Sequence, residues 1–224
     1  MSVFKKGSIV ADKYVLIKVL GEGEFGCVWR AKDLFSSEEV AIKKAKTIGL
    51  TDFKQEYDNL MKIGDSEAAT FAPTPYEYLS NLGIIVTSFE GNTFQNLHNS
   101  YAPFSTGTIC LLIFHAFKAL EAFHESGFSH HDLHWENIAL GKSDEKARVV
   151  FLDLGTLKTA TVTRKQYDVE CLLKSLDMMK TGDSTVRMMT RAFADNKSVP
   201  LDWLIGIVED EEDFDSAAEF PWNH

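Results

Sequence analysis

The apolar residues of the chain follow a strand-like pattern at first and a helix-like pattern further on. Residues 14–20 and 27–31 are rich in β-branched and apolar side chains, and a glycine-rich turn separates them. The shorter runs 40–43 and 83–87 have the same character. We therefore expect strands in these four places, which together form a β-rich front of the protein.

Helical spacing of apolar residues begins after residue 50. Thr51 or Asp52 can cap a helix that runs to about Ile63, and Ser105 can cap a long helix that runs to about Ser126. The later elements that we expect are strands at 138–140 and 149–152, a turn at 142–145 between them, and helices at 168–179 and 186–193. Because the strands come first and the helices follow, the expected fold class is α+β, with a helical back.

The size and charge of the chain limit its partners. Its 224 residues suffice for one globular domain, or for one domain split into two lobes, and 45% of them are hydrophobic, which is enough for a core. The formal net charge of −10 argues against nucleic acid or an anionic membrane as the main partner. We also expect no stretch that approaches a membrane span. The chain is therefore expected to have neither a nucleic-acid nor a membrane partner.

The cysteines indicate the compartment. Cys27, Cys110 and Cys171 lie far apart and without C-x-x-C spacing, which favours reduced thiols over a disulfide framework or a zinc site. Residues 1–10 lack the apolar core that is typical of a signal peptide. We expect a cytoplasmic or nuclear location.

Three glycines, Gly21, Gly23 and Gly26, lie in the turn between the first two expected strands. Glycine allows a sharp turn and exposes backbone N–H groups to phosphate oxygens. Glycine hairpins are common, so this segment alone is also compatible with a plain turn. Its position between two strands, and not between a strand and a helix, disfavours a dinucleotide-binding fold and favours a phosphate loop.

Lys43 closes the next expected strand. Such a lysine is usually a solvated strand end, but after a glycine hairpin it can reach the α and β phosphates of a nucleotide. It then needs a carboxylate to hold it in place. Glu56 on the following helix is the best candidate for that carboxylate, and otherwise it is an exposed helix charge.

The segment 129–137 carries the most specific pattern. Asp132 and Asn137 are separated by four residues on an expected tight loop. Asp132 can accept or orient the proton of an acceptor hydroxyl, while Asn137 can coordinate a metal that bridges phosphates. The nearby histidines could instead form a metal cluster, although the order of Asp132 and Asn137 favours the first interpretation.

Asp153 ends a buried apolar run sixteen residues beyond Asn137, and Gly155 follows it closely. A carboxylate at the end of a buried strand is well placed to bind magnesium. By itself this Asp-Leu-Gly sequence is compatible with an ordinary turn, and it gains meaning from the three motifs before it.

In this order the four motifs resemble the glycine loop, strand lysine, catalytic loop and metal-binding segment of the eukaryotic protein kinase superfamily. The resemblance implies a two-lobed, minimal protein-kinase-like fold that uses ATP and Mg²⁺. It implies that Lys43, paired with Glu56, positions the phosphates of ATP. It also implies that Asp132 orients the acceptor hydroxyl and that Asn137 and Asp153 hold the metal.

Three segments resemble the casein kinase 1 group more closely, including its tau-tubulin and vaccinia-related branches: 53–57, 85–91 and 127–141. The second of these, 85–91, resembles that group's hinge between the lobes. For the adenine site this resemblance implies Thr87 as the gatekeeper, backbone contacts from Ser88 and Glu90, and apolar contacts from Val28, Ala41 and Ala139. The expected domain organisation is an N-terminal lobe at 1–90, an abbreviated C-terminal lobe at 91–208 and, from the run of acidic residues that begins at Glu209, an acidic tail at 209–224.

The chain departs from the family pattern at two histidines and in one segment. His131 stands where most protein kinases have an arginine that pairs with a phosphorylated loop, so we expect no activation by loop phosphorylation. His134 stands where they usually have a lysine; here the loop is similar to that of haspin and shares Asp-Leu-His with aminoglycoside phosphotransferases. Only residues 156–166 remain for the activation segment, and they contain no Ala-Pro-Glu sequence.

Three functions remain open from the sequence. The first is an ATP- and Mg²⁺-dependent phosphotransferase, most simply a protein serine/threonine kinase, in which Lys43, Glu56, Asp132 and His134 act in catalysis. The second is a pseudokinase that works as a nucleotide-binding or protein-interaction scaffold, which the short activation segment favours. The third is a small-molecule kinase. The expected partners are ATP and either a protein substrate or a protein binding partner.

Overall fold

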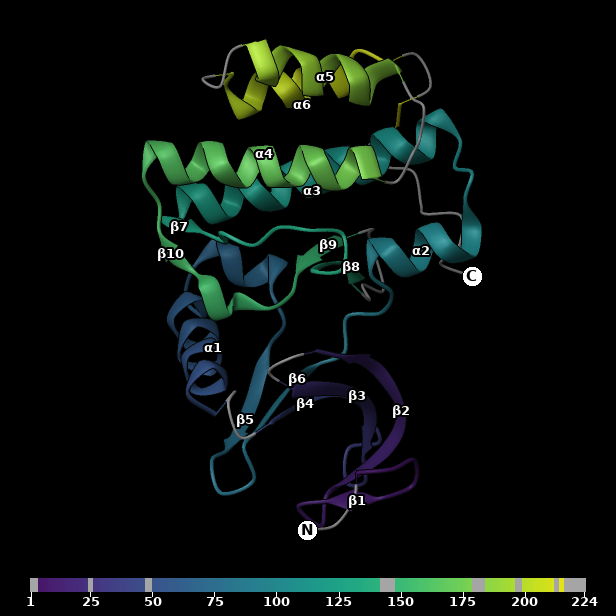
Figure 1. The fold of residues 1–224 in the computed structure, drawn as a ribbon, viewed down its shortest axis with the longest axis vertical. Coiled ribbons are helices and arrows are strands. Elements are labelled where there is room, and N and C mark those ends of the chain that lie inside the picture. Colours follow the sequence, from purple (N-terminus) through teal and green to yellow (C-terminus); the bar gives the residue numbers. More distant parts are fainter. Residues whose placement is uncertain are drawn as a thin grey trace.

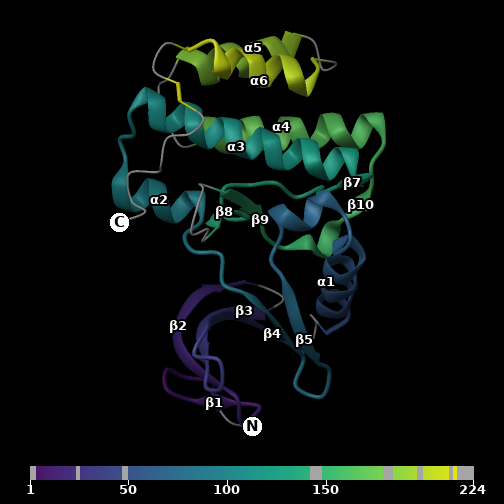
Figure 2. The same cartoon turned by 180° about the vertical axis from the view of Figure 1, so that it is seen from behind.

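The computed structural model describes residues 4–23, 26–46, 50–141, 148–178, 184–195, 199–211 and 214–215. A curled β-sheet with one long helix beside it forms one lobe, and a stack of helices forms the other (Figure 1). Figure 2 shows the same division from behind, with helices α5 (Ser184–Asp195) and α6 (Leu201–Glu209) at the end remote from the sheet. The expected α+β, two-lobed architecture is confirmed.

The N-terminal lobe is built on a six-stranded antiparallel sheet. Its strands are β1 (Ile9–Val10), β2 (Tyr14–Glu22), β3 (Gly26–Asp33), β4 (Glu39–Ala45), β5 (Pro75–Leu79) and β6 (Ile84–Ser88), in the spatial order β1-β2-β3-β4-β6-β5. Alternation along β4 separates two faces. Val40 and Ile42 are buried in the core of the sheet, whereas Ala41 and Lys43 line a cavity on the other side.

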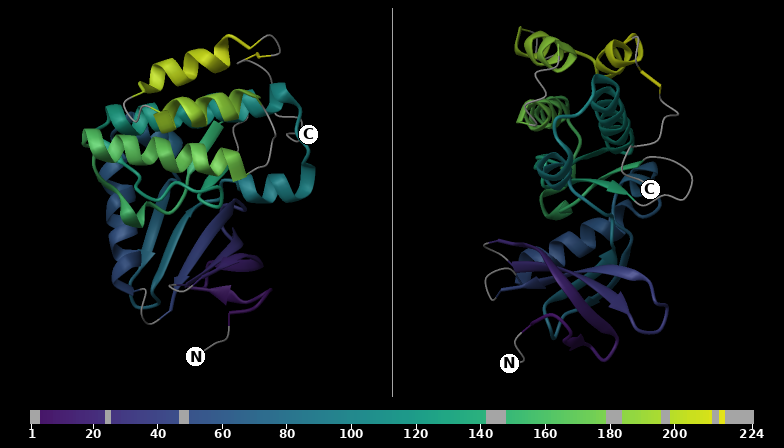
Figure 3. Two further views of the ribbon diagram at one scale, coloured as in Figure 1. Left: turned by 45° about the horizontal axis from the view of Figure 1, so that its top comes forward. Right: turned by 90° about the vertical axis from the view of Figure 1, so that its right-hand side faces the viewer.

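Helix α1 (Leu50–Ile63) packs on the sheet through Phe53, which contacts the buried Ala45 and Ile85. Figure 3 shows this helix running alongside the strands. The helix brings Glu56, which is one turn beyond Phe53, to the cavity side of β4. A 3-10 helix, Glu67–Phe71, then leads the chain into β5.

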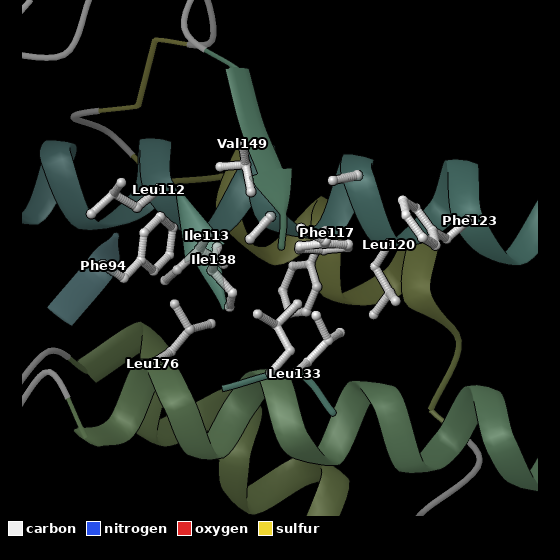
Figure 4. Close-up of a cluster of buried hydrophobic side chains, with 14 of the residues drawn as sticks. Phe94, Leu112, Ile113, Phe117, Leu120, Phe123, Leu133, Ile138, Val149 and Leu176 are labelled. Carbon is white, nitrogen blue, oxygen red and sulfur yellow. The ribbon is translucent and has the colours of Figure 1, made fainter. Parts of the chain in front are cut away.

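Five helices and two small ribbons form the described part of the C-terminal lobe. The helices are α2 (Phe94–Tyr101), α3 (Thr106–Glu125), α4 (Val162–Met178), α5 and α6. The ribbons pair β7 (Phe128–Ser129) with β10 (Lys158–Thr159), and β8 (Ile138–Gly141) with β9 (Arg148–Phe151). Helix α3 begins at the Ser105 cap, whose hydroxyl accepts the Thr108 N–H, and its apolar side chains meet β8, β9 and α4 in the main core (Figure 4).

Helix α3 is long and apolar enough to cross a membrane, with a mean hydropathy of 1.4 over its most apolar window, so the expectation of no such stretch was wrong. Length and composition are weak evidence, because the core helix of a soluble protein passes the same test. In this protein 61% of that window is buried, and Ile113, Phe117 and Leu120 are fully covered by the rest of the lobe. The packing accounts for the apolar sequence of α3.

The structure corrects several expected boundaries. Helix α1 begins at Leu50, before both predicted caps. Helix α4 begins at Val162 instead of 168, because the Thr161 hydroxyl accepts the Arg164 N–H and so caps the helix there. Sequence reasoning missed the short helices α2 and α6 and the strand β5. The other predicted strands and helices are present with shifts of a few residues, while the turn at 142–145 and residue 179 lie outside the described residues.

Candidate active site between the lobes

A cavity of about 570 Å³ lies between the two lobes. Most of the predicted site residues line it: Gly21, Gly23, Gly26, Val28, Ala41, Lys43, Glu56, Thr87, Ser88, Glu90, Asp132, His134, Asn137 and Asp153. They come from β2, β3, β4, α1, the hinge and the loops that follow β7 and β9. Segments that are far apart in the chain therefore meet around one space large enough for a nucleotide-sized ligand.

Lys43 forms an ion pair with two carboxylates in this cavity. Its Nζ lies 2.5 Å from Glu56 Oε2 and 3.1 Å from Asp153 Oδ2. Burial alone lowers the pKa of Lys43, but the two carboxylates outweigh it and hold the pKa above its ordinary value. For Asp153 the two effects have the reverse signs. Burial raises the pKa of this carboxyl, but the charge of Lys43 outweighs burial and keeps the pKa below its ordinary value. The predicted contact between Lys43 and Glu56 is present.

The three glycines of the hairpin differ in what they permit. A Cβ at Gly26 would lie 2.4 Å from the Lys44 carbonyl oxygen and 2.6 Å from the Phe53 ring, so close packing requires glycine there. A Cβ at Gly21 or Gly23 would meet nothing within 4 Å. Packing inside the protein therefore does not require glycine at these two positions. A ligand that approaches the backbone from the cavity would require it, because a side chain there would stand in its way.

The catalytic loop brings Asp132, His134 and Asn137 together. Asn137 Nδ2 donates to the Asp132 carbonyl oxygen at 3.1 Å and to its carboxylate at 3.3 Å. His134 Nε2 lies 3.8 Å from Asp132 Oδ2. Because the Asn137 amide nitrogen is engaged with Asp132, its amide oxygen remains available as an acceptor or ligand.

The donor set fits a magnesium ion that also binds phosphate oxygens. Asn137 and Asp153 both line the cavity and offer one amide oxygen and one carboxylate, which are hard ligands that Mg²⁺ accepts. Among the described residues there is no group of three His, Cys, Asp or Glu side chains arranged to hold a metal. The alternative of a histidine cluster is thus wrong, since the three rings point to different neighbours.

Those neighbours are distinct. His130 is buried, with Nε2 2.8 Å from the Leu152 carbonyl oxygen and Nδ1 accepting the Asp132 N–H at 3.3 Å. Burial holds the pKa of His130 below its ordinary value, so this ring is neutral. The His131 ring instead lies tilted against the Tyr167 ring, with centroids 4.8 Å apart.

Asp168 supports this loop from α4, and sequence reasoning missed it. The side chain is fully buried; Oδ2 accepts the His130 N–H at 3.1 Å and Oδ1 accepts the His131 N–H at 2.7 Å. His124 Nε2 on α3 lies 3.0 Å from Oδ2. The signal that could have revealed it is its helical spacing with Leu172 and Leu176, which places a carboxylate on the apolar face of α4.

Two predicted parts of the adenine site have partners within the protein. The Ser88 N–H donates to the Thr74 carbonyl oxygen, and the Ser88 carbonyl oxygen accepts the Thr87 hydroxyl. The predicted backbone contacts of Ser88 and Glu90 with adenine stay predictions. Ala139 is fully buried, bridges to Thr93 and is not among the described residues that line the cavity. Its predicted contact with the base stays a prediction.

The activation segment is shorter than expected. Lys158 pairs with Ser129 and Leu157 is buried, and α4 starts four residues after Lys158. Only residues 156–161 connect the Asp-Leu-Gly segment 153–155 to α4, and Thr156 donates its hydroxyl to the His130 carbonyl oxygen. The predicted segment 156–166 thus ran five residues into the helix.

Comparison with known proteins agrees with this geometry. Residues 14–175 match the protein kinase domain family. The chain is 30% identical over 136 residues to "Cyclin-dependent kinase F-4" of Oryza sativa, covering 58% of this chain and 29% of that protein. It is 23% identical over 156 residues to a probable serine/threonine-protein kinase of Dictyostelium discoideum, covering 66% and 30%. It is 25% identical over 164 residues to the probable serine/threonine-protein kinase PknB of Lactococcus lactis, covering 70% and 26%.

The chain thus spans less than a third of the length of these relatives. Among solved structures, a crystal structure of a kinase domain superposes with a TM-score of 0.65 at 18% identity, covering 78% of this chain and 67% of that one. The family match covers most of the chain, and the fold and the cavity residues agree with it. The chain belongs to the protein kinase domain family.

Proposed function

We propose that the protein binds ATP with Mg²⁺ in the cavity between its lobes and transfers the γ-phosphate to a serine or threonine hydroxyl of a protein. The observation that carries this proposal is Lys43, which is held between Glu56 and Asp153 beneath the glycine hairpin. A protonated lysine in this place can bind phosphate oxygens, and the two carboxylates keep it protonated and directed into the cavity.

Each remaining residue has a role that its position supports. When bound, Mg²⁺ neutralises charge on the phosphates, and Asn137 and Asp153 are the residues that would hold it. Asp132 orients the acceptor hydroxyl and accepts its proton. His134, beside Asp132, can donate a hydrogen bond to the transferred phosphate, where a lysine would supply a full charge. The resemblance to the casein kinase 1 group remains a prediction.

The experiment that tests this proposal measures binding and transfer separately. Mg²⁺-ATP should raise the thermal unfolding temperature of the protein, and radiolabelled ATP should label the protein itself, casein or histone. Lys43→Met and Asp153→Asn should abolish labelling without loss of folding. Lys54→Met and Asp58→Asn are matched controls, because these residues form an exposed ion pair on α1 and should leave labelling unchanged.

Asp132→Asn separates catalysis from binding. The variant should keep nucleotide binding and lose transfer by a factor of about 100 or more, because the amide cannot accept the proton. No stabilisation by millimolar Mg²⁺-ATP would refute the binding claim and leave only the fold.

The short activation segment favours two other functions. A pseudokinase needs no platform for a peptide, and residues 156–161 are too few to form one like that of longer segments. In that case nucleotide binding persists, no acceptor is labelled, and Asp132→Asn leaves the biological activity intact. A small-molecule kinase would label a low-molecular-weight acceptor in a cell extract and neither casein nor histone.

A further inference from the structure

The backbone just before Asp132 is in an unusual conformation. His131 has φ +69°, which lies in the left-handed region that side chains other than glycine rarely adopt. Such a conformation persists only where the surroundings hold it in place. Because His131 directly precedes Asp132, whatever holds His131 also sets the direction of the Asp132 carboxylate.

Two adjacent residues of α4 hold His131. Asp168 accepts the backbone N–H of His131 at 2.7 Å. The Tyr167 ring lies tilted against the imidazole ring, with ring centroids 4.8 Å apart and an interplanar angle of 32°. Helix α4 therefore fixes the backbone of His131 through Asp168 and the ring of His131 through Tyr167.

Tyr167 is itself well placed for this contact and has no other evident role in packing. It is 44% exposed, so it contributes little to the core. Its hydroxyl shares a hydrogen bond with Cys171, one turn further along α4, and this bond raises the pKa of Tyr167. Tyr167 is not among the described residues that line the cavity, so its effect on a nucleotide would be indirect.

We propose that Tyr167 is a positioning residue for phosphoryl transfer, which braces the His131 ring and thereby orients Asp132. This inference rests on the proposed function. The brace needs no phosphate on residues 156–161, since it comes from α4 itself. It also explains why an exposed aromatic ring, that of Tyr167, lies beside the residue that precedes Asp132.

The first test is hydrogen exchange, which does not depend on catalysis. Tyr167→Ala should speed the exchange of the His131 and Asp132 backbone amides by about tenfold, because the loop loses one of its two supports. Tyr167→Phe should exchange like the wild type, since it keeps the ring. Met178→Ala, at a 50% exposed position of the same helix, should also exchange like the wild type. Unchanged exchange in Tyr167→Ala overturns the proposal.

The second test follows transfer. Tyr167→Ala should lower kcat about tenfold and leave the nucleotide dissociation constant unchanged, while Tyr167→Phe and Met178→Ala retain kcat. In a His131→Ala background, Tyr167→Ala should cause little further loss, because its partner is already absent. A full loss in that background, or a Tyr167→Phe variant as impaired as Tyr167→Ala, overturns the brace. If Tyr167→Ala fails to fold, Tyr167→Leu replaces it in both tests, in the wild-type and in the His131→Ala background, with the same expected outcomes.

The two tests also separate this inference from the proposed function. A wild-type protein that transfers no phosphate refutes the proposed function, and the proposal that Tyr167 serves transfer falls with it, even where the exchange data support the contact with His131. A wild-type protein that transfers phosphate, together with normal kcat in Tyr167→Ala, refutes the brace alone.

Discussion

Glu90 and Arg148 form a partly buried ion pair that joins the hinge to strand β9. Arg148 Nη2 lies 2.9 Å from Glu90 Oε2, and the Glu90 side chain is only 5% exposed. The other oxygen of Glu90 accepts the Ser88 hydroxyl. A Cβ at Gly141 would lie 2.8 Å from Arg148 Nε and 3.2 Å from Glu90 Oε2, so the pair occupies a closely packed place. The Glu90 side chain thus anchors the hinge from within.

Arg148→Met should destabilise the protein by about 3 kcal/mol, because it leaves the buried Glu90 carboxylate without its partner. The free energy of unfolding in urea measures this effect. The double variant Arg148→Met with Glu90→Gln should recover part of the loss, since no uncompensated charge then remains. Equal losses in the single and double variants would show that packing, and not charge, explains the effect.

Gly26→Ala should affect stability, whereas Gly21→Ala should affect nucleotide binding. The first forces a Cβ against the Lys44 carbonyl and the Phe53 ring, so it should lower the free energy of unfolding by about 1–3 kcal/mol. The second meets open space and should leave that free energy unchanged, while it weakens stabilisation by Mg²⁺-ATP. Thermal unfolding with and without nucleotide separates the two effects. A Gly21→Ala protein that binds ATP like the wild type contradicts the role of the hairpin as a phosphate loop.

The stability of the protein should fall as the pH is lowered from about 7 to about 5. Burial lowers the pKa of His130 in the folded protein, whereas in the unfolded chain it is about 6.5. Below that value the unfolded chain binds a proton that the folded protein does not, so stability rises with pH in this window, by at most about 1.4 kcal/mol per pH unit for one histidine. Urea unfolding at a series of pH values gives the slope. His130→Gln should reduce it; an unchanged slope would assign the effect to other groups, such as His115, whose pKa burial also lowers.

Asp168→Asn should destabilise the protein by about 2–4 kcal/mol, because one of the buried backbone N–H groups of the catalytic loop then faces an NH₂ group. Burial raises the pKa of Asp168, but the bonds from His124 and the loop outweigh it and hold the pKa below its ordinary value. This contribution is therefore present above about pH 4 and is lost as the pH falls through the lowered value. Acid unfolding of wild type and variant provides the comparison, and Asp177→Asn on the same helix is the control. Transitions at the same pH for both proteins would contradict this role.

The sequence predicted the parts of the site that depend on neighbouring residues. The hairpin with Gly21 and Gly23, the strand that ends near Lys43, and the loop with Asp132 are local structures, so their residues carry the pattern that forms them. The contact from Lys43 to Glu56 was also predictable, because it needs only the next helix to pack on the sheet. Asp168 and Tyr167 escaped prediction because their partners, His130 and His131, lie 36 or more residues earlier in the chain. No local pattern records such a contact.

The sequence by itself determined the fold class and the order of the lobes, because alternation and capping depend on short stretches of chain. Its four motifs, through their resemblance to the protein kinases, indicated most of the groups that face the cavity. Only the tertiary structure decided how these groups are held. Ala139 lies buried because Thr93 reaches it from the start of α2, and Glu90 turns inward because Arg148 meets it from β9. Helix α4 begins at Val162, so the activation segment ends early and Tyr167 covers His131. These outcomes depend on packing between elements distant in the chain, where burial and paired charge outweigh local preference.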